Sequence, residues 1–232
     1  MEFWDIYDIN KKPTGRTMKR NDWCLKDGEY HLTVLGVVAR PDGTFLITKR
    51  VMTKAWAPGW WEVSGGAAQA GESSYDAVLR EVKEETGYTL TSYRFRGIVT
   101  FVSGNGVTEY MHLFTADEFE GKSIACDEGE LEWVKKEDVL KLNIWEGDRI
   151  FLRLLADEEP FFSLKLVYDG HDTLVSAVLN GKPMELFDIL NPDGSKTGIV
   201  RERVVAHREG SLHATVHMWI VRSNEKSGYD VL

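Results

Sequence analysis

Residues 66–88 constrain this chain more than any other stretch. They read GAAQAGESSYDAVLREVKEETGY, which combines a glycine-rich loop with one short helix. Ser73 and Asp76 have the spacing of a helix N-cap and its partner, and Gly87 is a natural C-terminal stop. Four apolar residues between these caps recur at helical spacing and are predicted to share one buried face: Tyr75, Val78, Leu79 and Val82.

Three acidic residues of this predicted helix fall on another face. Glu81, Glu84 and Glu85 are spaced i, i+3, i+4 and therefore project as one cluster beside the loop. Their mutual repulsion is relieved if a hard divalent cation such as Mg²⁺ lies among them, because Mg²⁺ prefers oxygen ligands. The alternative is a solvated acidic helix face, which is common on protein surfaces.

The whole stretch resembles the Nudix box of the Nudix hydrolases. The defining positions of that pattern are all filled here: Gly66, Glu72, Arg80, Glu81, Val82, Glu84, Glu85, Gly87 and Tyr88. The resemblance implies an α/β fold, the Nudix α/β/α sandwich with a mixed β-sheet. It also implies Mg²⁺-dependent hydrolysis of phosphoanhydrides, with Mn²⁺ as the alternative cation.

The resemblance further implies a metal-binding set. Glu81 and Glu85 would be direct ligands, and Glu84 would bind directly or through water. The carbonyl of Gly65, just before the box, would complete the protein's share.

Other residues take supporting roles under the same resemblance. Arg80 would orient the glutamates, or it forms only a surface ion pair. Glu72 suits the start of the helix, where a carboxylate interacts favourably with the helix dipole. The general base would be Glu128, in an acidic loop, with Glu130 as the rival and two solvated loop acids as the alternative.

Composition narrows the class of protein. The 232-residue chain has a formal net charge of −9 and no basic run, which disfavours a nucleic-acid polymer as partner. No apolar run approaches the length of a membrane span, and the N-terminus lacks the order of a signal peptide. Cys24 and Cys126 are expected to be free thiols of a reduced, cytoplasmic protein.

Strands dominate the expected elements. Residues 31–39 are predicted to be a strand, with 44–49 as its hairpin partner, and further strands are expected at 3–7, 60–64, 92–103, 110–116, 131–134, 161–168 and 173–179. Helices are expected at 136–140 and 147–157. We expect an N-terminal arm at 1–29, a Nudix hydrolase domain at 30–183 and a C-terminal partial repeat at 184–232.

That repeat is visible in the sequence. Residues 185–203 mirror residues 2–20, and residues 213–216 mirror 31–34 after a one-residue slip. The second copy lacks a box, and the chain is expected to end where its hairpin partner would begin. It is predicted to be an accessory element rather than a second active site, with unpaired strand edges that favour a partner such as a second copy in a homodimer.

The second half of the chain suggests a substrate. The segments around Gly129–Trp133, Asn143–Asp148 and 160–170 resemble MutT-type nucleoside triphosphate pyrophosphohydrolases that act on oxidised purines. By that resemblance Trp145 would stack on the base and Asp148 would bind its edge. Glu146-Gly147 departs in part from the acidic pair of that group. The leading expectation is hydrolysis of an oxidised purine (deoxy)nucleoside triphosphate such as 8-oxo-dGTP to the monophosphate and pyrophosphate.

Other functions stay open at this point. ADP-ribose, a nucleotide sugar or a dinucleotide is an alternative small-molecule nucleotide substrate. The first part, with WDIYD and GEYH, resembles a Nudix branch related to isopentenyl diphosphate isomerases, although the complete box favours hydrolysis. A non-catalytic nucleotide-sensing module is the third class, and retention of Glu81, Glu84 and Glu85 argues against it.

Overall fold

The structure is a computed structural model that describes residues 1–53, 57–126, 129–216, 218, 220–224 and 228–231. In chain order the elements are β1 (Phe3–Tyr7), β2 (Pro13–Lys19), β3 (Tyr30–Val38), β4 (Thr44–Arg50), β5 (Trp61–Glu62), β6 (Ser64–Ala67), α1 (Ser74–Thr86), β7 (Tyr88–Val102), β8 (Thr108–Gly121), β9 (Gly129–Lys135), α2 (Lys136–Val139), α3 (Glu146–Ala156), β10 (Phe162–Tyr168), β11 (Leu174–Leu179), β12 (Lys182–Pro183), β13 (Leu186–Leu190), β14 (Lys196–Glu202), α4 (Arg203–Glu209), β15 (Val221–Asn224) and β16 (Gly228–Val231). No helix among the described residues is long and apolar enough to span a membrane.

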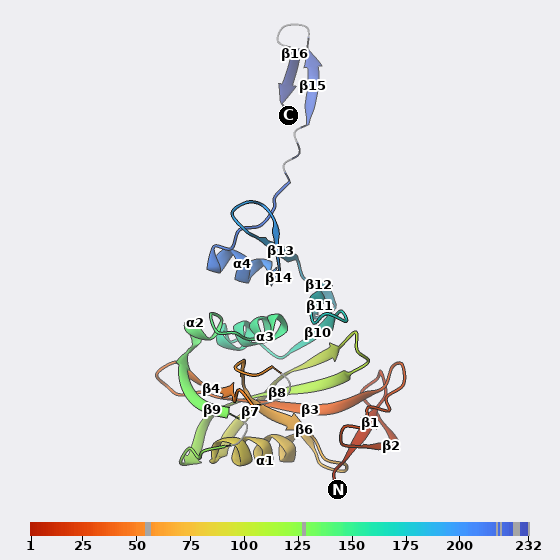
Figure 1. The fold of residues 1–232 in the computed structure, drawn as a ribbon, viewed down its shortest axis with the longest axis vertical. Helices are drawn as coiled ribbons and strands as arrows, with labels where there is room; N and C mark the ends of the chain where they lie inside the picture. Colours follow the sequence, from red (N-terminus) through yellow and green to blue (C-terminus); the bar gives the residue numbers. More distant parts are fainter. Residues whose placement is uncertain (54–56, 127–128, 217, 219, 225–227, 232) are drawn as a thin grey trace.

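Two sheets lie between helices. The main sheet runs in the order β12-β11-β10-β7-β8-β3-β1-β2, with β6 also paired to β3, and a smaller sheet contains β5-β4-β9. The main sheet is mixed, because β3 and β8 are parallel, as are β7 and β10, while its other pairs are antiparallel. Helix α1 covers one side, and α2 and α3 cover the other (Figure 1). The predicted α/β/α sandwich with a mixed sheet is confirmed.

Helix α1 forms between the predicted caps. The Ser73 hydroxyl accepts a hydrogen bond from the Asp76 backbone N–H at 3.2 Å, and the helix ends at Gly87, whose φ is +80°. Val78 and Val82 are fully buried, as the helical spacing predicts. The prediction for Tyr75 is wrong, because its ring meets Phe114 and neighbouring rings only at the rim of the core and stays 48% exposed.

Strand β4 is not the hairpin partner of β3. Only one isolated bridge, between Ala39 and Phe45, joins them, and β4 pairs instead with β5 and β9. Both edges of β3 are already occupied, by β8 on one side and by β1 and β6 on the other. The turn after β3 therefore carries the chain into the second sheet.

The two copies of the repeat share one hydrogen-bond register. Trp4 lies opposite Met18 in β1–β2, and Phe187 lies opposite Arg201 at the same place in β13–β14. The Trp4 ring stacks on His31 at 5.0 Å, and the Phe187 ring stacks on His213 at 4.4 Å. In each copy a histidine ring therefore stacks on the aromatic ring of the copy's first strand.

The copies differ in what surrounds them. Strand β1 joins the main sheet beside β3, whereas β13 and β14 form a separate two-stranded sheet above α3 (Figure 1). Beyond His213, the hairpin β15–β16 begins at Val221 and extends away from the rest of the molecule (Figure 1). This hairpin does not include the mirrored residues 213–216, of which His213 makes only an isolated bridge with Ile189.

Candidate active site

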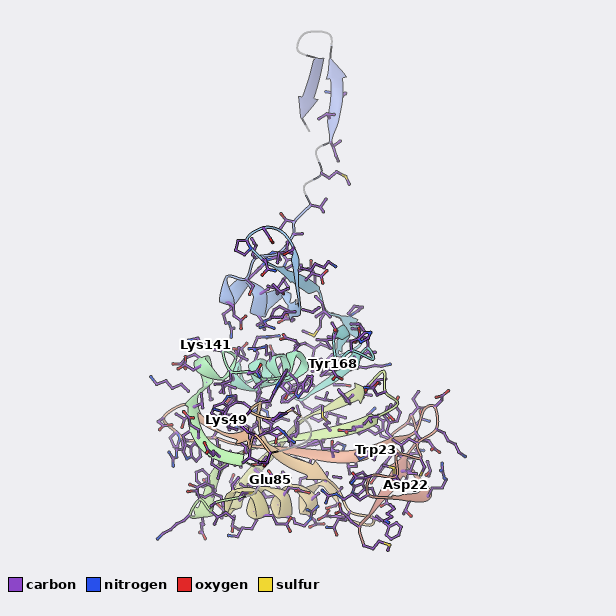
Figure 2. The ribbon with its side chains drawn as sticks, viewed as in Figure 1. Asp22, Trp23, Lys49, Glu85, Lys141 and Tyr168 are labelled. Carbon is purple, nitrogen blue, oxygen red and sulfur yellow. The ribbon has the colours of Figure 1, made fainter. Side chains whose placement is uncertain are left out.

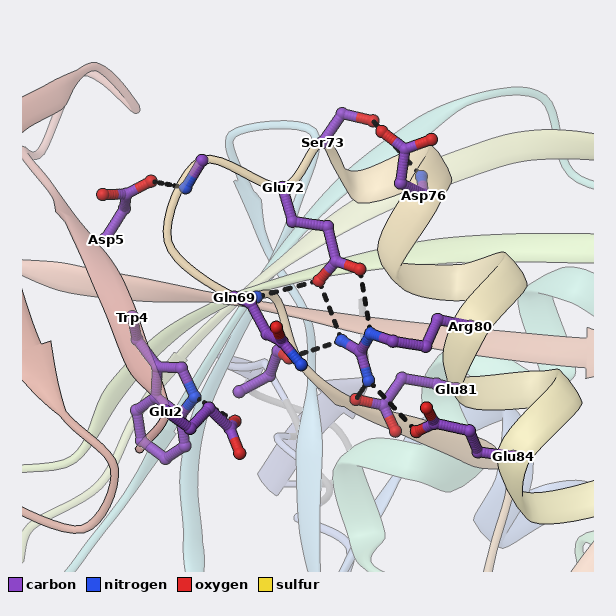
Figure 3. A network of polar contacts seen from close by, with 12 residues as sticks. Glu2, Trp4, Asp5, Gln69, Glu72, Ser73, Asp76, Arg80, Glu81 and Glu84 are labelled. Carbon is purple, nitrogen blue, oxygen red and sulfur yellow. Dashed lines mark hydrogen bonds and ion pairs between the residues drawn. The ribbon is translucent and has the colours of Figure 1, made fainter.

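Arg80 is the centre of the polar network at the box (Figure 3). Its Nε and Nη2 donate hydrogen bonds to the two carboxylate oxygens of Glu72 at 2.9 and 2.8 Å, and Nη2 also donates to the Ala67 carbonyl at 3.2 Å. Its Nη1 donates to Glu81 at 2.7 Å and to Glu84 at 3.4 Å. Burial alone would raise the pKa of Glu72, but the Arg80 hydrogen bonds lower it below its ordinary value. One guanidinium therefore joins the start of α1 to two acids of the predicted metal set.

The carboxylate of Glu81 lies directly against the loop backbone. A Cβ at Gly66 would be 2.6 Å from Glu81 Cδ, so only glycine lets the helix approach the loop this closely. Burial raises the pKa of Glu81 above its ordinary value, although Arg80 acts in the opposite direction. A carboxylate that is shielded from water in this way is strongly stabilised when a cation lies next to it.

Glu84 and Glu85 lie on the same helix, one turn beyond Glu81. Glu84 is exposed, and Glu85 accepts a hydrogen bond from the Gly65 backbone N–H at 3.1 Å. Glu85 lies on the α1 side of the sheets (Figure 2). Within the part of the chain that the structure describes, no three acidic, histidine or cysteine side chains are arranged so that they could hold a metal ion. Glu81, Glu84 and Glu85 nevertheless supply hard oxygen ligands from neighbouring turns of α1, and this donor chemistry fits a divalent cation such as Mg²⁺. We call Glu81, Glu84, Glu85 and Arg80 the carboxylate site.

A hollow of about 400 Å³ lies beside the end of α1. It is lined by these residues: Val51, Ser123, Ile124, Ala125, Cys126, Gly129, Glu130 and Leu131. The Ile124 backbone N–H donates to the carbonyl of Thr86, the last residue of α1, which ties one wall of the hollow to the end of that helix. Glu130, the rival general base, therefore faces this region, whereas Glu128 lies outside the described residues.

A second cluster surrounds the first turn of α3. The Trp145 ring stacks on the Trp60 ring with centroids 4.4 Å apart, and the Tyr168 ring stands edge-on to Trp145 at 6.3 Å. The Tyr168 hydroxyl accepts a hydrogen bond from the Gly147 backbone N–H at 2.7 Å, satisfying one free amide of the helix start. We call these three rings, together with Asp148, the aromatic site.

Asp148 is the chemically unusual member. Burial raises its pKa to about 8, the negative charge of Glu62 adds to the effect, and Arg149 opposes it. Two hydrogen bonds from Arg50, at 2.7 and 2.9 Å, engage Glu62. Asp148 is therefore mostly protonated at neutral pH and offers one donor and one acceptor side by side.

The structure explains why glycine follows Glu146. A Cβ at Gly147 would be 2.4 Å from Leu166 Cδ1 and 2.7 Å from the Tyr168 hydroxyl. A side chain at this position would displace Leu166 or Tyr168, so the packing of β10 against α3 favours glycine where the MutT-type group has an acid.

The predicted site residues thus fall into two groups. Glu81, Glu84, Glu85 and Gly65 come together at α1, and Trp145 and Asp148 come together at α3, whose neighbour Tyr168 lies on the opposite side of the sheets from Glu85 (Figure 2). Neither Trp145 nor Asp148 borders the hollow beside α1.

One short segment joins the two groups, and sequence reasoning missed its role. Trp60 stacks in the aromatic site and Glu62 acts on Asp148, while Gly65 and Gly66 already touch the glutamates of α1. The adjacent aromatic and acidic residues directly before the box were the available signal. Tyr168 gave no signal, because its place beside Gly147 depends on the packing of β10 against α3.

Several known proteins are similar to this chain in sequence or in structure. The model of the NUDIX domain matches residues 29–155. An uncharacterized Nudix hydrolase, YvcI of Bacillus subtilis (strain 168), is 37% identical over 51% of this chain and 78% of its own length. The oxidized purine nucleoside triphosphate hydrolase of Danio rerio is 29% identical over 64% of this chain and 94% of its own length. The crystal structure of a MutT protein from Bacillus halodurans aligns with a TM-score of 0.59 and 28% identity, over 66% of this chain and 99% of that one.

The NUDIX match spans more than half of the 232 residues. Members of this family are enzymes that act on nucleoside diphosphate derivatives, generally with divalent metal ions. The chain described here belongs to the Nudix hydrolase family.

Proposed function

We propose that this enzyme hydrolyses an oxidised purine (deoxy)nucleoside triphosphate, such as 8-oxo-dGTP, to the monophosphate and pyrophosphate. The observation that carries the proposal is Asp148, a largely protonated carboxyl beside the stacked rings of Trp60 and Trp145. A short segment connects it to a complete set of box glutamates. The purine would be held at α3 and the phosphates at α1.

The carboxylate site supplies the chemistry of cleavage. Glu81 and Glu85 would hold Mg²⁺, with Glu84 as a direct or water-mediated ligand and the Gly65 carbonyl as a further donor. When bound, Mg²⁺ (or Mn²⁺) neutralises charge on the phosphoryl oxygens and lowers the pKa of a bound water. Arg80 holds Glu81 in place through the 2.7 Å hydrogen bond and is itself fixed by Glu72.

A general base completes the proposed mechanism. We assign this role to Glu128, on the resemblance to the MutT-type group, with Glu130 as the rival; of the two, Glu130 is a described residue and lines the hollow beside the end of α1. The base would accept the proton of the attacking water as the phosphoanhydride bond breaks.

The aromatic site supplies selectivity. A Trp145 face offers a stacking surface to the base, and a protonated Asp148 both donates to and accepts from a purine edge. An oxidised purine differs from the normal one in the donors and acceptors of its imidazole edge, and a site that pairs those groups rejects the analogue that lacks them. The relative from Danio rerio, named as an oxidized purine nucleoside triphosphate hydrolase, supports this choice of substrate.

A substrate comparison tests the proposal. With Mg²⁺ present, kcat/KM is measured for 8-oxo-dGTP, dGTP, ADP-ribose, a nucleotide sugar and a dinucleotide, and 8-oxo-dGTP is expected to lead. The control is Glu81→Gln, which should abolish turnover of all of them. If 8-oxo-dGTP is no better than dGTP and both trail ADP-ribose, the proposal fails.

The organisation and setting of the enzyme are further proposals. We infer that residues 30–183 form the catalytic domain, that 1–29 and 184–232 are additions to it, and that the chain acts in the cytoplasm as a homodimer without nucleic-acid or membrane partners. The exposed free thiol of Cys24 supports a reduced compartment. Light scattering on the intact chain tests the oligomeric state.

A further inference from the structure

The C-terminal repeat, residues 184–232, packs on α3 through two rows of charges. In the first row Glu146 accepts a hydrogen bond from Arg201, whose Nε also donates to Glu209 at 3.1 Å. Arg149 completes this row, because it forms ion pairs with Glu146 at 3.4 Å and with Glu209 at 3.7 Å. Two of these four side chains, Glu146 and Arg149, belong to α3, and the other two belong to the repeat.

The second row lies one turn further along α3. Arg153 forms an ion pair with Glu202 at 3.3 Å, and both residues are buried. Asp157 pairs with Arg153 at 3.4 Å and with Arg208 at 3.5 Å. Met184 and Leu186 pack against the apolar core beneath α3, so the contact has an apolar base as well as the two charged rows.

Comparison of the two copies shows that the repeat is adapted to this contact. Arg201 occupies the register position that Met18 fills in the first copy, where the methionine is buried beside Trp4. Glu202 likewise occupies the position of the exposed Lys19. At two consecutive positions the second copy therefore carries charges complementary to α3 that the first copy lacks.

We propose that Arg201 is a positioning residue for substrate recognition, acting through Glu146 on the first turn of α3. The inference rests on the proposed function, because the residues flanking Glu146 are those of the aromatic site. Trp145 immediately precedes Glu146, and Asp148 follows two residues later. Arg149 also donates to the Leu142 carbonyl at 2.7 Å, which ties the preceding loop to the same row.

The physical basis is the weak start of this helix. The N-cap position is occupied by Trp145, whose side chain makes no capping hydrogen bond, so the first turn depends on other contacts. The Gly147 backbone N–H donates a hydrogen bond to the Tyr168 hydroxyl, and the Glu146 carboxylate is paired with Arg201 in the first charged row. Without Arg201, the half-buried carboxylate of Glu146 loses its strongest cation, and the turn that presents Trp145 and Asp148 loses one of the contacts that fix it.

The experiment uses the intact chain with Arg201→Met, the side chain found at this position in the first copy. The matched control is Arg203→Met, because Arg203 pairs with Glu185 inside the repeat at 2.6 Å and faces solvent. For 8-oxo-dGTP with Mg²⁺ we expect KM to rise about tenfold in Arg201→Met with kcat within about twofold, the loss expected for about one charge-assisted hydrogen bond. Arg203→Met should leave both constants unchanged, and Arg201→Lys should fall between them.

A second readout does not depend on turnover. With fluorotryptophan incorporated, the ¹⁹F resonance of Trp145, identified by its loss in Trp145→Phe, should shift in Arg201→Met and stay in place in Arg203→Met. Glu146→Gln should reproduce the KM change, and the double variant should be no worse than either single one. Glu146→Gln also decides the question if Arg201→Met folds poorly, because it leaves Arg201 in place.

The outcomes separate the two proposals. If KM and the Trp145 resonance in Arg201→Met match those of Arg203→Met, the positioning role is wrong. It is equally wrong if kcat falls while KM and the resonance stay constant. If the wild-type chain hydrolyses no oxidised purine nucleotide, the proposed function fails, and the Trp145 resonance alone then decides whether Arg201 positions the turn.

Discussion

The protonation of Asp148 gives the sharpest test of base recognition. With a pKa of about 8, Asp148 carries its proton in about nine-tenths of molecules at about pH 7 and in about one-tenth at about pH 9. If the protonated form binds the purine, kcat/KM for 8-oxo-dGTP should fall about tenfold over this range. The size of the fall follows from the titration alone.

The matched variant is Asp148→Asn, which keeps a donor and an acceptor but does not titrate. We expect the ratio of wild-type to variant kcat/KM to fall about tenfold between about pH 7 and pH 9. Dividing the wild-type kcat/KM by that of the variant cancels the pH dependence that comes from every other titrating group of the enzyme or the substrate. A ratio that stays constant across this range would refute the role of the protonated carboxyl.

Stability supplies an independent measurement of the same group. Because the folded pKa of Asp148 lies above its unfolded value of 3.8, the native state binds more protons between these two values. The free energy of unfolding should therefore decrease as the pH rises from about 4 to about 8, with the full loss reached above that window. The melting temperature of Asp148→Asn should show a smaller decline than that of the wild type. Equal declines would show that Asp148 titrates normally in the fold.

Three further predictions follow from the site. Glu81→Gln should lower kcat by at least about a hundredfold with Mg²⁺ and should weaken Mg²⁺ binding in calorimetry, whereas unchanged Mg²⁺ affinity would remove Glu81 from the ligand set. Gly147→Ala should lower the free energy of unfolding by about 1–3 kcal/mol in a denaturant titration, because its Cβ meets the Tyr168 hydroxyl and the side chain beneath it; a neutral effect would contradict the packing argument. Glu128→Gln should lower kcat by about a hundredfold, and a comparable loss in Glu130→Gln with none in Glu128→Gln would transfer the role of general base.

The box was predictable because its determinants are local. The caps of α1 depend on Ser73 and Gly87 alone, and the spacing of its glutamates follows from helical geometry. The exposed Tyr75 was not predictable, because periodicity gives the side of a helix but not how far the core extends under its first turn. The pairing of β4 was missed for a related reason: it depends on the edges of β3 being occupied by strands distant in sequence.

The aromatic site was predictable only in part. Resemblance pointed to Trp145 and Asp148, but the raised pKa of Asp148 arises from burial and from Glu62, which lies 86 residues earlier in the chain. The contact of Arg201 with Glu146 depends on the docking of the repeat, and the sequence showed the repeat without showing where it lies. Long-range packing, rather than local pattern, accounts for both omissions.

The crossing from β5 to β6 has a consequence for substrate size. Glu62 ends a strand of the smaller sheet and Ser64 begins a strand of the main sheet, so Val63 alone bridges the two. Under the proposed function, with the base at the aromatic site and the phosphates at the carboxylate site, the distance between them would be set by how the two sheets pack. On that proposal, a polyphosphate of another length would be accommodated by a shift of one sheet against the other, because Val63 leaves no slack in the chain between them.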